Sequence, residues 1–278
     1  MRAPLSILLA LAATACGGAE QNDGVAIVDA RAPRPVALPA VSGPPDPSLP
    51  LVVIDPGHGG RDPGAIAPDL AEKDVTLAIA RAVRDALLEL GGVRVAMTRD
   101  ADRQVPLGDR PEMARRLRAD LFLSIHADAA PREGARGASI YTLSEVASDR
   151  EAAALAQREN ASPAGPGGQD MPNAVAAILF DLAQRESLEA AADFARLLHR
   201  EGEGRLVFRQ DYRRFAALAV LRSSEVPSAL FECGYLTNAE DAAFLRSDEG
   251  RRRIADSVAR AVQVHFARRP ALTSGARG

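Results

Sequence analysis

The sequence feature that most constrains the fold is a short apolar run that stops abruptly at residue 55. Residues 51–54 read Leu-Val-Val-Ile, which is typical of a strand buried on both faces. Asp55, Pro56 and Gly57 end it, because proline cannot donate to a ladder and glycine adopts backbone angles closed to other residues. His58 follows at once. A histidine at the carboxyl end of a central strand lies where open α/β sheets carry their sites, and a histidine of the turn without a ligand role is the alternative.

The pattern of strand followed by helix then repeats. Helical spacing of apolar residues predicts a helix after Asp74, a suitable N-cap, and a second helix over 107–118. Strands are predicted over 93–98, 121–125, 137–142 and 215–221. Alternating strands and helices with short connections imply right-handed crossovers and a parallel sheet. We therefore expect one α/β domain with a mostly parallel twisted sheet of about six strands, flanked by helices on both faces.

Three candidate metal ligands fall on one edge of this sheet. His58 and His126 each follow a buried strand, and Glu72 precedes the first helix. The simpler interpretation of Glu72 is an acid favoured by the helix dipole. Two histidines and one carboxylate with an open fourth position are, however, a catalytic zinc arrangement, and such an ion makes a bound water molecule acidic near neutral pH.

Four motifs together resemble a known family, the zinc-dependent N-acetylmuramoyl-L-alanine amidases of the bacterial cell-separation type. They are Asp-Pro-Gly-His-Gly-Gly-x-Asp-x-Gly at 55–64, Glu-Lys-Asp at 72–74, Thr-Arg at 98–99 and Ser-Ile-His-Ala-Asp at 124–128. The resemblance covers the chain from about residue 51 to 266. It implies a Zn²⁺ ion bound by His58, Glu72 and His126.

A further apolar run, 228–231, ends at Glu232. A lone ionised carboxylate there would be costly without partners, and a salt bridge to an arginine is the simpler explanation. The stretch 226–238 is similar to the last motif of the family, which implies that Glu232 is the catalytic general base and later the acid. Cys233 points to the opposite face of the strand, so we interpret it as a buried apolar residue and not as a nucleophile.

Residues 145–200 are predicted to be helical and lie where some members of the family carry a regulatory insertion. The resemblance implies that a helix of the insertion covers the zinc site until an activator protein displaces it. Glu151 and Glu159 are the candidates for an acid that fills the open position of the zinc. Acids that simply face water are the alternative.

The flanking segments predict export. Residues 1–15 have the pattern of a secretory signal, and 13–17 (Ala-Thr-Ala-Cys-Gly) resemble a lipobox, which implies a lipid anchor at Cys16 and sorting to the outer membrane. Plain secretion is the alternative. The proline-rich stretch 16–50 predicts a disordered tether, 51–267 the catalytic domain and 268–278 a disordered tail.

The expected function is hydrolysis of the amide between N-acetylmuramic acid and L-alanine in peptidoglycan, for wall remodelling and daughter-cell separation in the periplasm. Arg61, Arg99 and Arg110 are candidates for a positive rim that receives peptide carboxylates. A catalytically silent peptidoglycan-binding lipoprotein and a zinc peptidase for another amide are the alternatives. The formal net charge of −3 gives no sign of the basic surface that a nucleic-acid-binding protein needs. His199 and His265 are expected to be packed or solvated and not to bind a metal.

Overall fold

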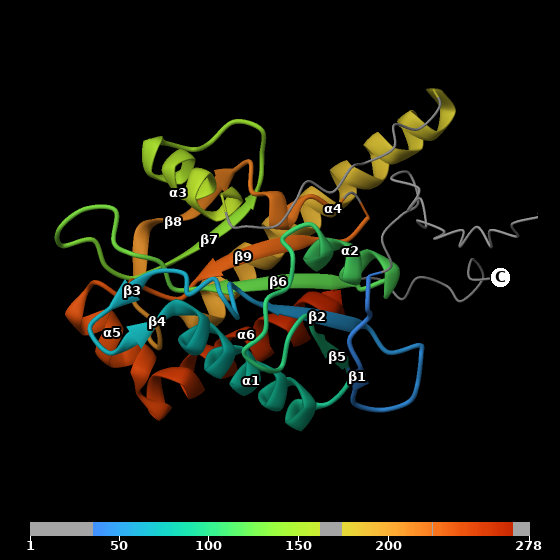
Figure 1. The fold of residues 1–278 in the computed structure, drawn as a ribbon. Helices are drawn as coiled ribbons and strands as arrows, with labels where there is room; N and C mark the ends of the chain where they lie inside the picture. The colour runs from blue at the N-terminus through green and yellow to red at the C-terminus, as the bar shows by residue number, and fades with distance from the viewer. Residues whose placement is uncertain (1–35, 162–173, 224, 269–278) are drawn as a thin grey trace, which may run out of the picture. The chain divides into compact units, whose positions relative to one another are not determined.

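A twisted sheet forms the centre of the computed structural model, which describes residues 36–161, 174–223 and 225–268. Within these residues the sheet has seven strands (Figure 1). Their spatial order is β1 (Val41–Ser42), β5 (Arg94–Met97), β2 (Leu51–Pro56), β6 (Leu121–His126), β9 (Ser228–Glu232), β7 (Ala138–Leu143) and β8 (Phe208–Ala216). A short hairpin of β3 (Ile66–Ala67) and β4 (Leu70–Ala71) stands apart from the sheet.

The four central strands, β5, β2, β6 and β9, run parallel to one another. β1 is antiparallel to β5, and β7 is antiparallel to β9 but parallel to β8. The prediction of a mostly parallel α/β sheet is therefore confirmed, although the sheet is larger than the six strands expected. The added strand, β1, belongs to the segment predicted to be a tether: Val41 and Ser42 pair with Ala96 and Val95. Its neighbouring prolines hide this edge strand from a pattern search.

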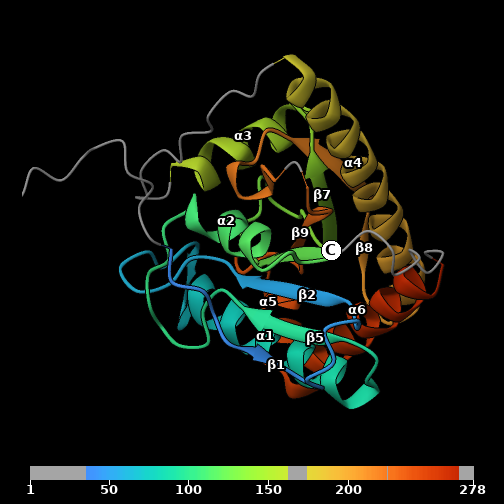
Figure 2. The ribbon, with the colours of Figure 1, turned by 90° about the vertical axis from the view of Figure 1, so that its right-hand side faces the viewer.

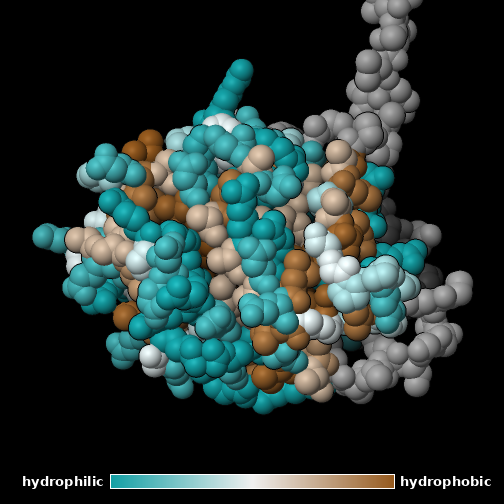
Figure 3. All heavy atoms as spheres, turned by 90° about the horizontal axis from the view of Figure 1, so that it is seen from below, coloured by the Kyte–Doolittle hydropathy of each residue, from teal (hydrophilic) through white to brown (hydrophobic). Residues whose placement is uncertain are grey.

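Helices cover both faces of the sheet, as expected (Figures 1 and 2). The helices α1 (Glu72–Leu90), α4 (Ala174–Gly202) and α6 (Asp248–Arg268) pack on one face, and α5 (Ala239–Arg246) packs against α6. The other face carries α2 (Asp109–Arg116), α3 (Arg150–Asn160) and the 3₁₀ turn η1 (Ala219–Leu221). Figure 3 shows the side on which α1 and α5 lie, and its surface is largely hydrophilic.

The side chains of β6 alternate between the two faces of the sheet, and this determines which layer of helices the candidate site faces. Leu121, Leu123 and Ile125 belong to the core under α1, α4 and α6, whereas Phe122 belongs to the core under α2 and α3. Successive side chains of a strand point to opposite faces, so His126 shares the face of Phe122. The side chain of His126 therefore points toward the layer that contains α3.

Several predicted boundaries shift. α1 begins at Glu72 with Ala71 as its N-cap, so Asp74 lies in the first turn and is not the cap. The strand predicted over 215–221 is β8 at 208–216 followed by η1, because the arginine-rich sequence of β8 lacks an apolar run. The signal at 1–15, Cys16 and the tail from 269 lie outside the described residues, as do residues 162–173 of the predicted insertion. None of the helices that the structure describes is both long and apolar enough to cross a membrane.

Candidate functional site

The three predicted metal ligands meet at the carboxyl edge of the sheet. His58 follows β2, His126 ends β6, and Glu72 opens α1. Glu72 Oε2 lies 3.2 Å from His58 Nε2, and Glu72 Oε1 lies 3.1 Å from His126 Nδ1. The two imidazole rings meet edge to face with centroids 5.0 Å apart. The sequence thus identified three groups that the fold brings into contact.

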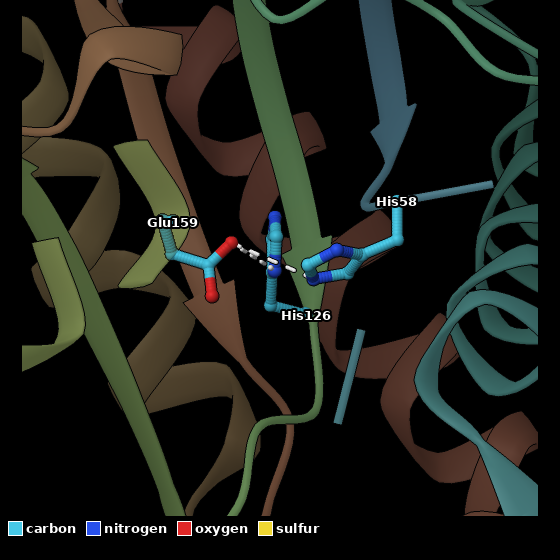
Figure 4. A group of neighbouring side chains, drawn as sticks. All are labelled: His58, His126 and Glu159. Carbon is cyan, nitrogen blue, oxygen red and sulfur yellow. Dashed lines mark ion pairs between the residues drawn. The ribbon is translucent and has the colours of Figure 1, made fainter. Parts of the chain in front are cut away.

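A fourth group, Glu159 at the end of α3, completes the cluster (Figure 4). Its Oε2 lies 3.5 Å from His58 Nε2 and 3.3 Å from His126 Nδ1. Of the two candidate gating acids, Glu159 therefore lies at the site. Glu151 does not, because its carboxylate binds Arg209 and Arg214 two turns earlier on α3.

These side chains fit a metal ion. Neighbouring ligand atoms of a tetrahedral site with bonds of about 2.0–2.1 Å lie about 3.4 Å apart, close to the 3.1–3.5 Å separations of these nitrogen and oxygen atoms. His58 Nε2 is buried and makes no hydrogen bond of good geometry, as expected of a nitrogen that serves as a ligand. His58, His126 and Glu159 could hold a metal ion.

Two of the three candidate ligands, Glu72 and His58, are held by groups outside the cluster. Glu72 accepts hydrogen bonds from the backbone N–H groups of Ala65 (2.8 Å) and Ala127 (3.0 Å). His58 Nδ1 lies 3.0 Å from Asp62 Oδ2, which leaves Nε2 for the site. Burial opposes the charged imidazole, but Glu72, Asp62 and Glu159 outweigh it and raise the pKa of His58 to about 11. The site is an anionic cage that favours a positive charge.

Two buried arginines hold the loop that carries His58. Arg110 donates to Asp55 Oδ1, Pro56 O and His58 O, each at 2.8 Å. Arg99 donates to the carbonyl oxygens of Pro56 (3.0 Å) and Gly57 (2.7 Å). His58 has a φ of 59°, a left-handed conformation that a non-glycine residue rarely adopts unless its surroundings enforce it.

The expectation that Arg99 and Arg110 form a substrate-receiving rim is therefore wrong. Their exposures are 0% and 4%, and their donors are used by the protein itself. They are structural because the carboxyl ends of parallel strands leave carbonyl groups without ladder partners, and these carbonyls must be satisfied inside the protein. Arg61 is exposed, so for this residue the rim stays a prediction.

Glu232 lies beside the ligand cluster on the neighbouring strand, as the Cα partner of His126. It is fully buried; its Oε2 accepts a hydrogen bond from the backbone N–H of Asp128 (3.2 Å), and its Oε1 has no hydrogen-bond partner. Burial and the nearby carboxylates of Asp128 and Glu72 raise the pKa of Glu232 well above its usual range. Among the residues that the structure describes, no arginine forms an ion pair with Glu232, which argues against the simpler explanation of this acid. Cys233 is buried in the opposite core, as predicted.

The sequence did not reveal how α3 is held over the site. Arg158 forms an ion pair with Asp128, and Asn160 bonds Ala217 O (2.9 Å) and the N–H of Ala219 (2.8 Å). These partners lie far apart in the chain, so no local pattern predicts them.

The other two histidines lie elsewhere, as expected: His199 stacks on Tyr212 and His265 packs against Phe194.

The comparisons with known proteins all find similarity to one family of enzymes. The family model Amidase_3, described as N-acetylmuramoyl-L-alanine amidase, matches residues 52–264. AmiC of Neisseria meningitidis is 40% identical over 221 residues, which cover 78% of this chain and 53% of AmiC, so the chain spans about half the length of that relative. AmiA of Escherichia coli is 37% identical over 220 residues, 78% of this chain and 76% of AmiA. The structure of AmiC2 of Nostoc punctiforme matches with a TM-score of 0.59 and 31% identity, over 79% of this chain and 98% of that one.

The arginine clamp makes a prediction about stability. Replacing Arg110 by methionine (R110M) leaves the Asp55 carboxylate buried without its ion partner and should lower the free energy of unfolding by about 3–5 kcal/mol. Urea denaturation followed by circular dichroism measures this. The matched control is R115M on the same helix, because Arg115 is half exposed and its bond to Glu112 should contribute less than about 1 kcal/mol. Equal losses in the two variants would contradict the clamp.

Proposed function

The chain belongs to the N-acetylmuramoyl-L-alanine amidase family, and we propose that it hydrolyses the amide bond between the lactyl group of N-acetylmuramic acid and L-alanine in peptidoglycan. The observation that carries this proposal is the position of Glu232. This acid is the cross-strand neighbour of His126 and stands beside a cage formed by His58, Glu72 and His126. A proton-transfer group and a cation site thus lie next to one another at a single sheet edge.

We further propose that His58, Glu72 and His126 hold Zn²⁺. Two neutral imidazoles and one carboxylate are a donor set that zinc accepts in hydrolases. When bound, the ion supplies Lewis acidity toward the amide carbonyl and lowers the pKa of water. Glu72 suits this role because two backbone N–H groups hold its carboxylate, which leaves a lone pair on each oxygen for the site.

Glu232 is the group that moves protons in this proposal. Its Oε2 is fixed by the Asp128 N–H, and its Oε1 is free to take a proton from the attacking water and to give it to the leaving amine. The backbone bond orients the carboxyl group, so that one oxygen faces the reactants while the other is held. Burial keeps bulk water away from this transfer.

Glu159 acts as a gate. In the closed form its carboxylate lies beside the imidazoles of His58 and His126, where a substrate carbonyl has to approach. Arg158 and Asn160 fasten the end of α3 to the Asp128 loop and to the segment before η1. We propose that an activator protein displaces α3. The side chains of His58 and His126 are only 9% and 5% exposed in the closed form, so substrate reaches them only after this opening.

For the setting, we propose periplasmic wall remodelling and daughter-cell separation. The signal pattern of residues 1–15 and the lipobox-like Cys16 support export and a lipid anchor at the outer membrane. Globomycin-sensitive processing of the precursor tests the anchor. A precursor that is cut normally in the presence of the inhibitor would leave plain secretion as the route.

The catalytic assignment is tested on purified sacculi. The protein should release stem peptides by cutting the lactyl–alanine amide, and E232Q should reduce the initial rate about 10²- to 10⁴-fold because the general base is lost. Chromatography with mass spectrometry identifies the products. E89Q, an exposed acid of α1, is the control and should retain full activity. Cuts at another amide would favour the peptidase, and uncut sacculi in every zinc-loaded form would favour a silent binding protein.

The metal assignment is tested by affinity. Competition with a chromophoric chelator should give one zinc per chain, and D62N should weaken zinc binding about 10- to 100-fold because His58 Nδ1 loses its carboxylate partner. D69N alters an exposed acid of the same loop and should bind zinc as the parent does. Unchanged affinity in D62N would show that Asp62 does not orient a ligand.

The gate is tested by removing its carboxylate. E159A should raise kcat/KM on soluble muropeptides about tenfold or more, because the competent form is then a larger fraction of the protein. Q157A, an exposed neighbour on α3, should behave as the parent. A fall in activity of E159A with normal zinc content would instead make Glu159 part of the working site.

A further inference from the structure

A second charged cluster lies under the first turn of α3, away from the metal ligands. Arg209 and Arg214 come from β8, and α3 lies against this strand (Figure 1). Arg209 Nη2 lies 2.7 Å and Arg214 Nη1 3.2 Å from Glu151 Oε2, and Arg214 also binds Asp149, the N-cap of α3. Arg132 reaches Glu151 Oε1 at 3.2 Å. Both acids that face the β8 arginines from above therefore belong to the proposed gate segment.

The arginines keep their positions through contacts that do not involve α3. Arg209 Nη1 donates to Tyr235 Oη at 2.7 Å, and its guanidinium lies 5.9 Å from the Tyr235 ring centre. The Arg214 guanidinium lies 5.7 Å from the ring centre of Tyr141. Asp211 of the same strand lies 3.4 Å and 3.5 Å from the two groups. These contacts pre-organise both guanidinium groups before any ligand arrives.

Displacement of α3 would leave this cluster with excess positive charge. The three arginines contribute +3 and Asp211 contributes −1, so the net charge is +2 once Asp149 and Glu151 leave. The side chains of Arg209 and Arg214 are only 8% and 2% exposed, and Arg214 Nε is buried without a hydrogen-bond partner. Once α3 no longer covers them, these two pre-organised guanidinium groups present positive charge without their acidic partners, which favours the binding of another anion.

We propose that Arg209 and Arg214 form a subsite for a carboxylate in the peptide part of the substrate, and that α3 imitates an acidic peptide in the closed form. The proposal rests on the amidase function and gate proposed above. Tyr141 is the cross-strand partner of both Arg214 and Leu230, two residues before Glu232, so the subsite and the catalytic acid belong to one stretch of sheet.

The spacing of the two acids along α3 indicates how far the subsite lies from the amide that is cut. Glu151 and Glu159 are eight residues apart, which corresponds to about 12 Å along a helix. An extended peptide covers about 12 Å in about four residues. The recognised carboxylate should therefore lie within about four residues of the amide that is cut. Planar guanidinium groups suit such a carboxylate because they bind it with two parallel hydrogen bonds.

The test compares two synthetic N-acetylmuramoyl peptides that differ only in the carboxyl groups of their first four residues, which are free acids in one and carboxamides in the other. Binding is measured by calorimetry on the full chain carrying E151Q, E159A and E232Q. The first two changes remove the competing carboxylates of α3, and E232Q prevents cleavage. We expect about tenfold tighter binding of the acid, and loss of that preference in R209Q and in R214Q.

Controls separate recognition from structure. R213Q alters an exposed arginine of the same strand and should keep the preference, and R214K should keep part of it. If Arg209 and Arg214 have a merely structural role, R209Q and R214Q should weaken binding of the acid and of the carboxamide equally. Equal binding of both peptides by the chain that carries only E151Q, E159A and E232Q overturns the subsite. Acid preference without cleavage by the E159A enzyme would overturn the amidase proposal alone, and cleavage without preference would overturn the subsite alone.

Discussion

The ion pair between Arg110 and Asp55 is the interaction on which the site depends. It is buried at the point where β2 ends, and Arg110 also binds the carbonyl oxygens of Pro56 and His58. Without these donors, the carbonyl groups of Pro56 and His58 would lose hydrogen bonds inside the protein, and the turn that keeps His58 at positive φ would be weakened. The strand places the histidine at the sheet edge, the arginine holds its backbone, and Asp62 orients its imidazole.

Two kinds of carboxylate face the histidines, and their supports differ. Glu72 opens α1 and accepts hydrogen bonds from two backbone N–H groups, that of Ala65 in the loop before β3 and that of Ala127 directly after β6, so it cannot leave without disrupting both segments. Glu159 is carried by α3, which is attached through Arg158, Asn160 and a small apolar face. One acid is thus a permanent part of the cage and the other is exchangeable. This difference in attachment is the reason why we propose Glu72 as a metal ligand and Glu159 as a gate.

Local sequence patterns predicted the central strands and the candidate site residues, but contacts between residues far apart in the chain were not predicted. Buried runs before His58 and His126 located the parallel core and its site, because a strand interior and its end are visible in a few consecutive residues. Only the end of β8 was predicted, because an edge strand that carries Arg209, Arg213 and Arg214 resembles a solvated segment. The roles of Arg99 and Arg110 were predicted wrongly, because nothing local shows which carbonyl groups an arginine will satisfy. Glu159 could be proposed but not chosen over Glu151 until the fold placed α3.

The two acidic ends of α3 leave the protein surface together or not at all. The helix has only 11 residues, a length that is marginal in water, so its order depends on Ala152, Leu155 and Ala156 packing on the sheet. A partner that lifts this apolar face removes the support of the whole helix, and Glu159 and Glu151 then lose their positions in one event. In the proposed mechanism, opening the candidate metal site and uncovering the arginines are therefore a single transition, which would couple access to Glu232 with readiness to bind an anionic peptide.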